Sequence, residues 1–288
     1  MRMDRQFAVF ILSHGRADNV KTIKALTQSG YTGRIYIIID DEDEQRQEYI
    51  NRYGKSVIVF NKQEAALNVD VADLKKQRNV VVYARNQCHS IANKLGLTHF
   101  VEMDDDYSWF SFKQFIDGHS KERRIHNIDE VFDITFDFLD VSGAAAVCCA
   151  QGGDYIGGAL GTMATQRLTR KAMNVFFCKT DRLFKFYGRL NEDTTAYTRL
   201  GQQGILFFTF ADWMVHQEMT QQSAGGLTDA YLDAGTYVKS FYSVMFSPSC
   251  VRLGVLGDGS RGERHERIHH RVIWGKCTPK IISSKYKK

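Results

Sequence analysis

The sequence predicts an α/β fold in which a mostly parallel central sheet is flanked by helices. In the first half of the chain, short apolar runs alternate with segments of helical spacing, a pattern typical of parallel strands joined by crossover helices. Acidic residues stand directly after two of these runs. The chain has 288 residues, 43% of them hydrophobic, and only two prolines. We therefore expect one continuous domain over residues 1–288.

Apolar runs and helix signals give each expected element its bounds. Strands are expected at residues 7–12, 34–39, 56–60, 99–103, 144–150 and 205–210. Helices are expected at residues 18–26, 45–53, 84–95, 128–139 and 193–201. Asp18 is expected to cap the first helix, and Gly30, Gly54 and Gly96 to end three of them.

Charge and cysteine use restrict the class of protein. The formal net charge of +5 is too mild by itself to indicate a nucleic-acid binder. Residues 261–288 are predominantly basic, which suits either a solvated terminus or an edge that contacts phosphate. The six cysteines show no C-x-x-C or zinc-ligand spacing, as expected for reduced thiols of a cytoplasmic protein. No apolar run is long enough to cross a membrane, so a soluble protein is predicted.

Three adjacent carboxylates, Asp104, Asp105 and Asp106, follow the expected strand at 99–103. Ligands of parallel sheets bind beyond the carboxyl ends of the strands. Neighbouring carboxylates repel one another, and a divalent cation would relieve that repulsion. Oxygen ligands suit Mg²⁺ or Mn²⁺, with substrate phosphate completing the shell. The other interpretation is a solvated acidic turn.

Glu192 and Asp193 stand where a helix is expected to begin. A carboxylate in that position caps the helix. The functional alternative is a general base that takes the proton from an attacking hydroxyl.

His216 follows the expected strand at 205–210. It is either a structural residue or a nitrogen ligand of the same metal.

Three further patterns allow a functional and a structural interpretation. Arg85 and Asn86 are either ordinary helix residues or a cation and an amide beside a diphosphate. The glycines of 152–161 fit neither the G-x-G-x-x-G motif nor the P-loop motif. This excludes a Rossmann dehydrogenase and a P-loop ATPase, and the glycine-rich loop could instead line the acceptor side of a substrate site. His265 and His269 would share a helix face, but a charged, solvated segment is favoured over a metal site.

Taken in chain order, these motifs resemble the GT-A glycosyltransferases, which have a Rossmann-like nucleotide-diphospho-sugar transferase fold. The resemblance spans Phe7 to about His216. The matching stretches are SHGRADN at 13–19, IIIDD at 37–41, ARN at 84–86, DDD at 104–106 as the D-x-D motif, and ED at 192–193 as the x-E-D motif.

This resemblance implies a role for each matching residue. Asp104 and Asp106 would bind Mn²⁺ or Mg²⁺, with His216 as a further metal or phosphate contact. Asp193, beside Glu192, would be the catalytic base, and the reaction would invert the sugar. Residues implied to hold a UDP-sugar are Ser13, His14, Arg16, Asp40, Asp41, Arg85, Asp104 and Asp105. The Ser-His-Gly-Arg at 13–16 departs from the Pro-x-Tyr-Asn type of many relatives, which leaves the nucleotide contacts of this loop open.

The whole chain also resembles the TET-associated glycosyltransferases of bacteriophages. That resemblance implies phage DNA with 5-hydroxymethylcytosine or 5-hydroxymethyluracil as the acceptor, in host cytoplasm. Residues 1–106 would bind the nucleotide-sugar, 107–245 the acceptor, and 246–288 would form a basic C-terminal segment. A base of duplex DNA must leave the stack or be reached in a groove. Candidate stacking residues, each equally a core aromatic, are Tyr107, Trp109 and Trp213; candidate phosphate contacts are Lys121, Arg123, Arg124, Arg261, Arg264 and Arg267.

Other functions share part of this pattern. A glycosyltransferase acting on a polysaccharide or protein would carry the same donor-side residues. A non-catalytic DNA-binding module would not need Asp104, Asp106 and Asp193. A sugar nucleotidyltransferase would need a glycine-rich loop with Arg or Lys after the first strand, which Ser13 to Arg16 do not supply. The sugar, the modified base and the oligomeric state are open at this point.

Overall fold

The computed structural model describes residues 5–75, 78–217, 237–258 and 265–279. Its strands are β1 (Phe7–Leu12), β2 (Arg34–Asp40), β3 (Val57–Phe60), β4 (His99–Asp104), β5 (Tyr107–Ile116), β6 (His119–Arg124), β7 (Ala146–Gln151), β8 (Leu168–Thr169), β9 (Phe176–Lys179), β10 (Phe207–Gln217), β11 (Val251–Asp258) and β12 (His265–Val272). Its α-helices are α1 (Lys21–Gln28), α2 (Arg46–Tyr53), α3 (Lys62–Leu67), α4 (Val82–Lys94), α5 (Ile128–Ser142), α6 (Thr162–Gln166), α7 (Glu192–Gly201) and α9 (Val238–Phe246).

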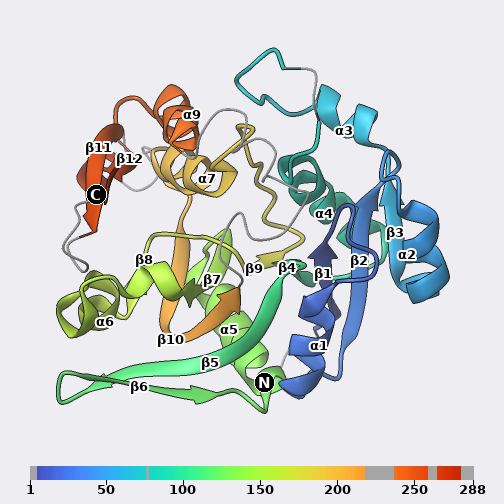
Figure 1. Ribbon diagram of the computed structural model, residues 1–288, viewed down its shortest axis with the longest axis horizontal. Helices are drawn as coiled ribbons and strands as arrows, with labels where there is room; N and C mark the ends of the chain where they lie inside the picture. The colour runs from blue at the N-terminus through green and yellow to red at the C-terminus, as the bar shows by residue number, and fades with distance from the viewer. Residues whose placement is uncertain (1–4, 76–77, 218–236, 259–264, 280–288) are drawn as a thin grey trace, which may run out of the picture.

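One ten-stranded sheet runs through both halves of the chain (Figure 1). Its order is β3-β2-β1-β4-β9-β7-β10-β5-β6, with β8 paired to β10. The four strands of the first half are parallel, as predicted. Beyond β4 the sheet is mixed, because β9 and the β5–β6 hairpin run antiparallel to their neighbours. The separate β11–β12 pair is antiparallel.

Strand register brings the carboxyl ends of β1, β2 and β4 to one edge of the sheet. Leu12 of β1 is opposite Ile38 on one side and Asp104 on the other. The loop after β1, the acids after β2 and the acids after β4 therefore start from the same edge. This is where an α/β sheet binds ligands.

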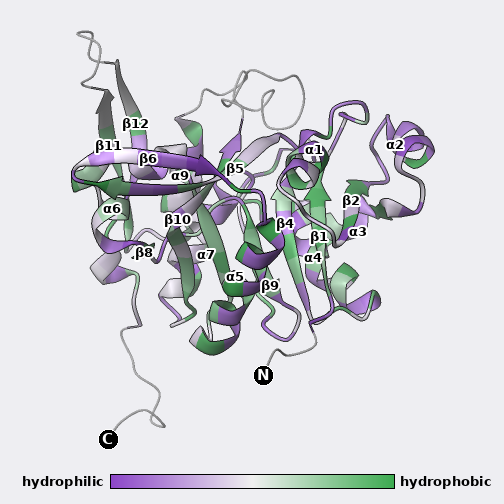
Figure 2. Ribbon diagram, turned by 90° about the horizontal axis from the view of Figure 1, so that it is seen from below, coloured by the Kyte–Doolittle hydropathy of each residue, from purple (hydrophilic) through white to green (hydrophobic). Residues whose placement is uncertain are grey.

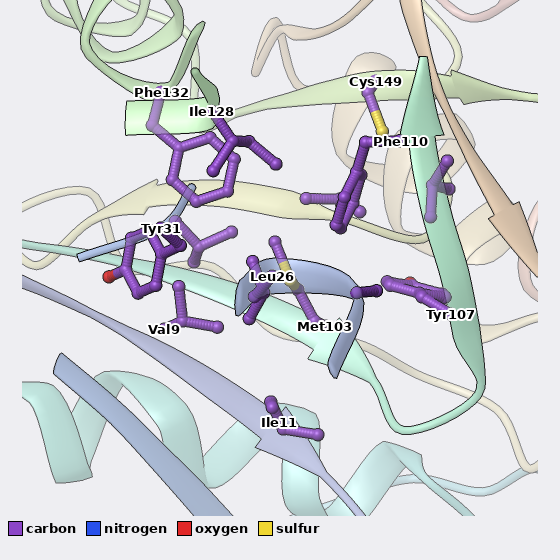
Figure 3. Packing of buried hydrophobic residues seen from close by; sticks show 14 of the residues in the cluster. Val9, Ile11, Leu26, Tyr31, Met103, Tyr107, Phe110, Ile128, Phe132 and Cys149 are labelled. Atoms are coloured by element: carbon purple, nitrogen blue, oxygen red, sulfur yellow. The ribbon is translucent and has the colours of Figure 1, made fainter. Parts of the chain in front are cut away.

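Residue alternation along β1 divides the core between the two faces of the sheet. Val9 and Ile11 pack with α1 and α5 residues such as Leu26 and Phe132 (Figure 3). Their sequence neighbours Ala8 and Phe10 belong to the other cluster, together with residues of α4 and α7. Both faces are thus buried, which explains why β1 is a continuous apolar run and lacks a polar face.

Several expected elements differ from the structure. Asp18 does not cap α1: the helix begins at Lys21 after Val20 with no side-chain cap, and the Thr22 N–H donates to the carbonyl of Asp105. Strand β10 is longer than expected and contains His216. The glycine-rich stretch includes two short 3₁₀ turns, Gly152–Tyr155 and Gly158–Leu160.

The histidine-rich segment is a strand. His265–Val272 pairs with β11 residue by residue, so His265 and His269 do not share a helix face. Helix α3, strand β9 and the β5–β6 hairpin had no sequence prediction. Arg261 and Arg264 lie outside the described residues. No helix in the described ranges is long and apolar enough to span a membrane.

Candidate active site

Strand alternation places two acids of β4 on the same face. Successive side chains of a strand point to opposite faces, so Glu102 and Asp104 share the face covered by α4 and α7, while Met103 enters the opposite cluster. Glu102 is fully buried and Asp104 is half-buried at the strand end. The first acid is thereby fixed inside the core and the second reaches the edge.

Arg85 of α4 joins these acids to α7. Its Nη2 lies 3.0 Å from Asp104 Oδ1, and its Nε lies 3.0 Å from Glu192 Oε1. Its Nη1 lies 3.7 Å from Glu102 Oε2. Arg85 is only 4% exposed, so water screens these attractions little. One cation thus lies beside three acidic side chains. Burial raises the pKa of Glu102 to about 8, although the positive charge of Arg85 acts to lower that pKa.

Asp105 points instead to the loop that follows β1. Its Oδ1 accepts from Arg16 Nη1 at 2.8 Å, and its Oδ2 accepts from the Ser13 hydroxyl at 2.5 Å. The Ser13 oxygen lies 2.6 Å from the Tyr49 hydroxyl, and the Arg16 N–H donates to that same hydroxyl. The structure thus brings Ser13, Arg16 and Asp105 together as predicted candidates, and their mutual bonds fix the shape of the loop.

The acids that follow β2 form a second cluster at this edge. His14 Nδ1 lies 2.9 Å from Asp40 Oδ2 and 3.5 Å from Asp43 Oδ2, and Lys62 Nζ lies 3.2 Å from Asp40 Oδ1. Burial would raise the pKa of Asp40, but His14 and Lys62 hold it below its usual value. Asp41 is half-buried and accepts the Lys62 N–H at 2.9 Å. Asp40 is therefore a structural anchor, and Asp41 is the more accessible of the two.

Asp106 has one unsatisfied carboxylate oxygen. Its Oδ1 is buried without a hydrogen-bond partner. Burial, together with Asp104 and Asp105, raises its pKa to about 7. A buried, unpartnered acceptor is unfavourable unless a ligand or proton satisfies it. Asp104 and Asp106 therefore fit a divalent cation such as Mg²⁺, which often takes one or two carboxylates and completes its shell with substrate phosphate.

His216 lies elsewhere. Its ring stacks on Trp109, with centroids 3.5 Å apart and planes 6° apart. Its Nε2 lies 2.6 Å from Glu122 Oε1 and 3.0 Å from Ser111 Oγ. In the described part of the chain, no three His, Cys, Asp or Glu side chains are grouped to hold a metal. The pairing of β10 with β5 and of β5 with β6 thus gives His216 a stacking partner and a carboxylate partner, and the structure does not assemble it with Asp104 and Asp106.

Helix α7 presents Glu192 and Asp193 in different settings. Glu192 is 5% exposed and bound to Arg85, whereas Asp193 is half-buried. An Asp193 oxygen accepts the Thr194 N–H at 2.5 Å. Burial raises the pKa of Asp193, while Arg85 and Lys171 oppose that rise.

The site also contains residues that had no functional prediction. Asn191, before α7, has a left-handed backbone with φ of 55°. Its Nδ2 lies 3.1 Å from Ser243 Oγ and 3.0 Å from His270 Nδ1. Non-glycine residues in this conformation are uncommon and concentrate at functional sites. The β11–β12 pair thereby reaches the start of α7, a contact that no local sequence signal could reveal.

Two of the predicted stacking residues belong to the core. Tyr107 is fully buried and Trp213 is 3% exposed. Trp109 is half-buried and stacks on His216. The side chain of Arg267 lies outside the described residues. Lys121, Arg123 and Arg124 are all exposed on β6.

A family model described as TET-Associated Glycosyltransferase matches residues 7–226. This match covers most of the chain and all the predicted motifs, and the chain belongs to this family. It is therefore a glycosyltransferase, as the order of its motifs predicts.

No curated protein matches the sequence. Among solved structures, glucosyl-3-phosphoglycerate synthase from Mycobacterium tuberculosis in complex with Mg²⁺ and uridine-diphosphate is 11% identical, covering 92% of this chain and 87% of that chain with a TM-score of 0.45. The S. aureus TarS fragment 1–349 is 10% identical, covering 84% of this chain and 65% of that chain with a TM-score of 0.43. Likenesses this distant carry no information on substrate.

The charge balance around Arg85 predicts the effect of its removal. Arg85→Met leaves three carboxylates without their cation and is expected to destabilise the fold by about 3–5 kcal/mol. Adding Glu192→Gln should restore part of that loss, because one buried charge is removed. Urea unfolding of the two variants measures both effects. If Arg85→Met alone were as stable as the unchanged chain, the bridging role of Arg85 would be refuted.

Proposed function

We propose that this glycosyltransferase moves a sugar from a UDP-sugar to the hydroxyl of a hydroxymethylated pyrimidine in DNA, with inversion. Family membership supports the DNA acceptor, since the family is expected to act on such bases. The edge that gathers the loop after β1, the acids after β2 and the Asp104–Asp106 cluster supports the donor site. The observation that carries the proposal is the buried, unpartnered Oδ1 of Asp106, next to Asp104 and Asp105 in the chain.

Asp104 and Asp106 are the residues that would hold Mn²⁺ or Mg²⁺. A bound divalent cation supplies positive charge beside the donor diphosphate and stabilises it as a leaving group. Arg85 orients Asp104 through their 3.0 Å contact. Asp41, the more accessible of the two acids after β2, would contact the nucleoside. Asp105 keeps the loop at 13–16 in shape through Ser13 and Arg16.

Asp193 is the proposed base. Its carboxylate takes the proton of the acceptor hydroxyl, and the hydroxyl oxygen forms a bond to the anomeric carbon as the bond to the diphosphate oxygen breaks. Its raised pKa makes it a stronger base than an exposed aspartate. Glu192 cannot share this task while Arg85 binds its carboxylate inside the core. Glu192 is therefore assigned a positioning role.

An acceptor assay tests the proposed reaction. The protein is incubated with Mn²⁺ or Mg²⁺, a panel of UDP-sugars, and DNA containing 5-hydroxymethylcytosine or 5-hydroxymethyluracil. Mass spectrometry of the digested nucleosides is expected to show one modified base heavier by one hexose or N-acetylhexosamine. Metal-dependent hydrolysis of UDP-sugar with no heavier nucleoside would exclude the DNA acceptor. It would favour a polysaccharide or protein acceptor instead.

Replacement of the proposed base should affect turnover and not donor binding. Asp193→Asn keeps the shape of the side chain and removes its basicity, so kcat is expected to fall about 10²–10⁴-fold. The affinity for UDP should stay unchanged. Asp181→Asn, at an exposed acid, is the matched control. Near-normal turnover of Asp193→Asn would assign the base to another residue.

A further inference from the structure

Asn191 stands at the start of α7 but its side chain does not cap that helix. Asparagine is among the strongest helix caps, because its side-chain oxygen can accept a backbone N–H of the first turn. Here no bond of that kind forms. The Thr194 N–H of the first turn bonds instead to the carboxylate of Asp193. The Asn191 amide therefore has another use in this structure.

The amide joins α7 to two elements of the C-terminal part of the chain. Its Nδ2 donates at 3.1 Å to Ser243 Oγ, a fully buried group of α9, and at 3.0 Å to His270 Nδ1 on β12. Both hydrogens of the amide are thereby used. We call these three residues the α7 clamp. Both partners of Asn191 follow residue 226, where the family match ends, so the matched region does not include the whole clamp.

The clamp requires a neutral His270. An amide N–H can be accepted only by a ring nitrogen that carries no proton, so the proton of this histidine is on Nε2. Burial lowers the pKa of His270 to about 3, and the nearby His269, Lys239 and Lys171 act in the same direction. His270 therefore stays neutral at physiological pH and continues to accept the amide hydrogen.

The next residue of the chain is held from another part of the molecule. Glu192 binds Arg85 of α4 inside the core. Two successive residues are thus tied to different elements, Asn191 to α9 and β12 and Glu192 to α4, which fixes the first turn of α7. Asp193 follows directly, and its carboxylate bonds to an N–H of that same turn. The position of the first turn therefore sets the position of the Asp193 carboxylate.

We propose that Asn191 is a positioning residue that aims Asp193 at the acceptor hydroxyl, and that Ser243 and His270 hold Asn191 in place. A base acts only when its oxygen lies within hydrogen-bond reach of the proton that it removes. A displacement of about 1 Å can cost on the order of 100-fold in rate. This inference rests on the assignment of Asp193 as the base in the proposed function.

The clamp is remote from much of the donor side. The β11–β12 pair lies at one end of the molecule, and α2, which follows the acids after β2, lies at the other end (Figure 1 and Figure 2). Tyr49 of α2 contacts Ser13 in the loop after β1. Loss of the clamp should therefore lower turnover and leave the binding of the donor unchanged.

Four variants separate the clamp from a general loosening of α7. Asn191→Gly removes the amide and keeps a residue that adopts the left-handed backbone easily. His270→Leu removes the ring acceptor, whereas His270→Asn keeps an oxygen acceptor near the position of Nδ1. Ser247→Ala is the matched control. It removes a buried 3.1 Å contact with the hydroxyl of Thr198, which joins the same helix to the residue after α9.

Turnover is measured in the acceptor assay with Mn²⁺, UDP-sugar and hydroxymethylated DNA. The kcat of Asn191→Gly and of His270→Leu is expected to fall about 10–100-fold, with an unchanged KM for the UDP-sugar. His270→Asn should recover most of that loss, and Ser247→Ala should turn over like the unchanged chain. In an Asp193→Asn background, Asn191→Gly should cause no further loss, because a residue that acts through the base has no effect once the base is gone.

A second measurement needs no acceptor. The pKa of the Asp193 carboxyl is followed by ¹³C NMR, and its signal is assigned with Asp193→Asn. Burial raises this pKa, although the neighbouring N–H and cations act to lower it. Without the clamp, water should reach the first turn of α7. The pKa is therefore expected to fall toward that of an exposed aspartate in Asn191→Gly and to stay unchanged in Ser247→Ala.

Each failure has its own pattern. Normal turnover of Asn191→Gly, an equal loss in Ser247→Ala, or a further loss in the Asp193→Asn background would overturn the inference and leave the proposed function standing. Normal turnover of Asp193→Asn would remove the base and this inference with it. If no hydroxymethylated DNA is modified, the proposed acceptor fails and the carboxyl pKa decides. An unchanged pKa of Asp193 in Asn191→Gly would then overturn the positioning role.

Discussion

The contact of one buried arginine with three carboxylates organises the active-site edge. Arg85 joins β4 to α7 through Asp104 and Glu192, and Glu102 lies beneath it. These elements are far apart in the sequence, so the buried pairs fix their relative positions. Breaking a buried pair leaves an uncompensated charge, whereas an intact one contributes little net stability. At the end of β4, burial and the neighbouring Asp104 and Asp105 raise the pKa of Asp106, because a second and third negative charge are unfavourable there without a cation.

The parts of the fold that depend on local sequence signals were predictable. Apolar runs gave β1, β2, β4 and β7 to within two residues, because strands buried on both faces carry no polar alternation. The β5–β6 hairpin was missed because β6 is HSKERR, which has neither an apolar run nor β propensity. The segment forms a strand because it pairs with β5. The prediction that Asp18 caps α1 was wrong for a similar reason. The Thr22 N–H at the start of α1 donates to the distant carbonyl of Asp105, and not to a nearby side chain.

The candidate site was predictable in composition and less so in arrangement. The sequence placed Asp104, Asp106 and Asp193 at element ends. It could not show that Asp105 turns to Ser13 and Arg16, since three adjacent acids look equivalent along the chain. Nor could it show that His216 would pair with Glu122, a residue of a hairpin it did not predict. The proposed donor-side residues thus follow from motifs, whereas the surroundings of His216 depend on the pairing of β10 with β5 and of β5 with β6.

We propose that Asp104 and Asp106 hold a divalent cation against a nucleoside diphosphate. Isothermal titration calorimetry of UDP, with Mn²⁺ and then with EDTA, tests it without any acceptor. We expect UDP binding to require Mn²⁺ and to weaken at least about tenfold in Asp106→Asn, which is the scale of loss when a metal site is perturbed. Equal UDP affinity with Mn²⁺ and with EDTA, unchanged by Asp106→Asn, would contradict it.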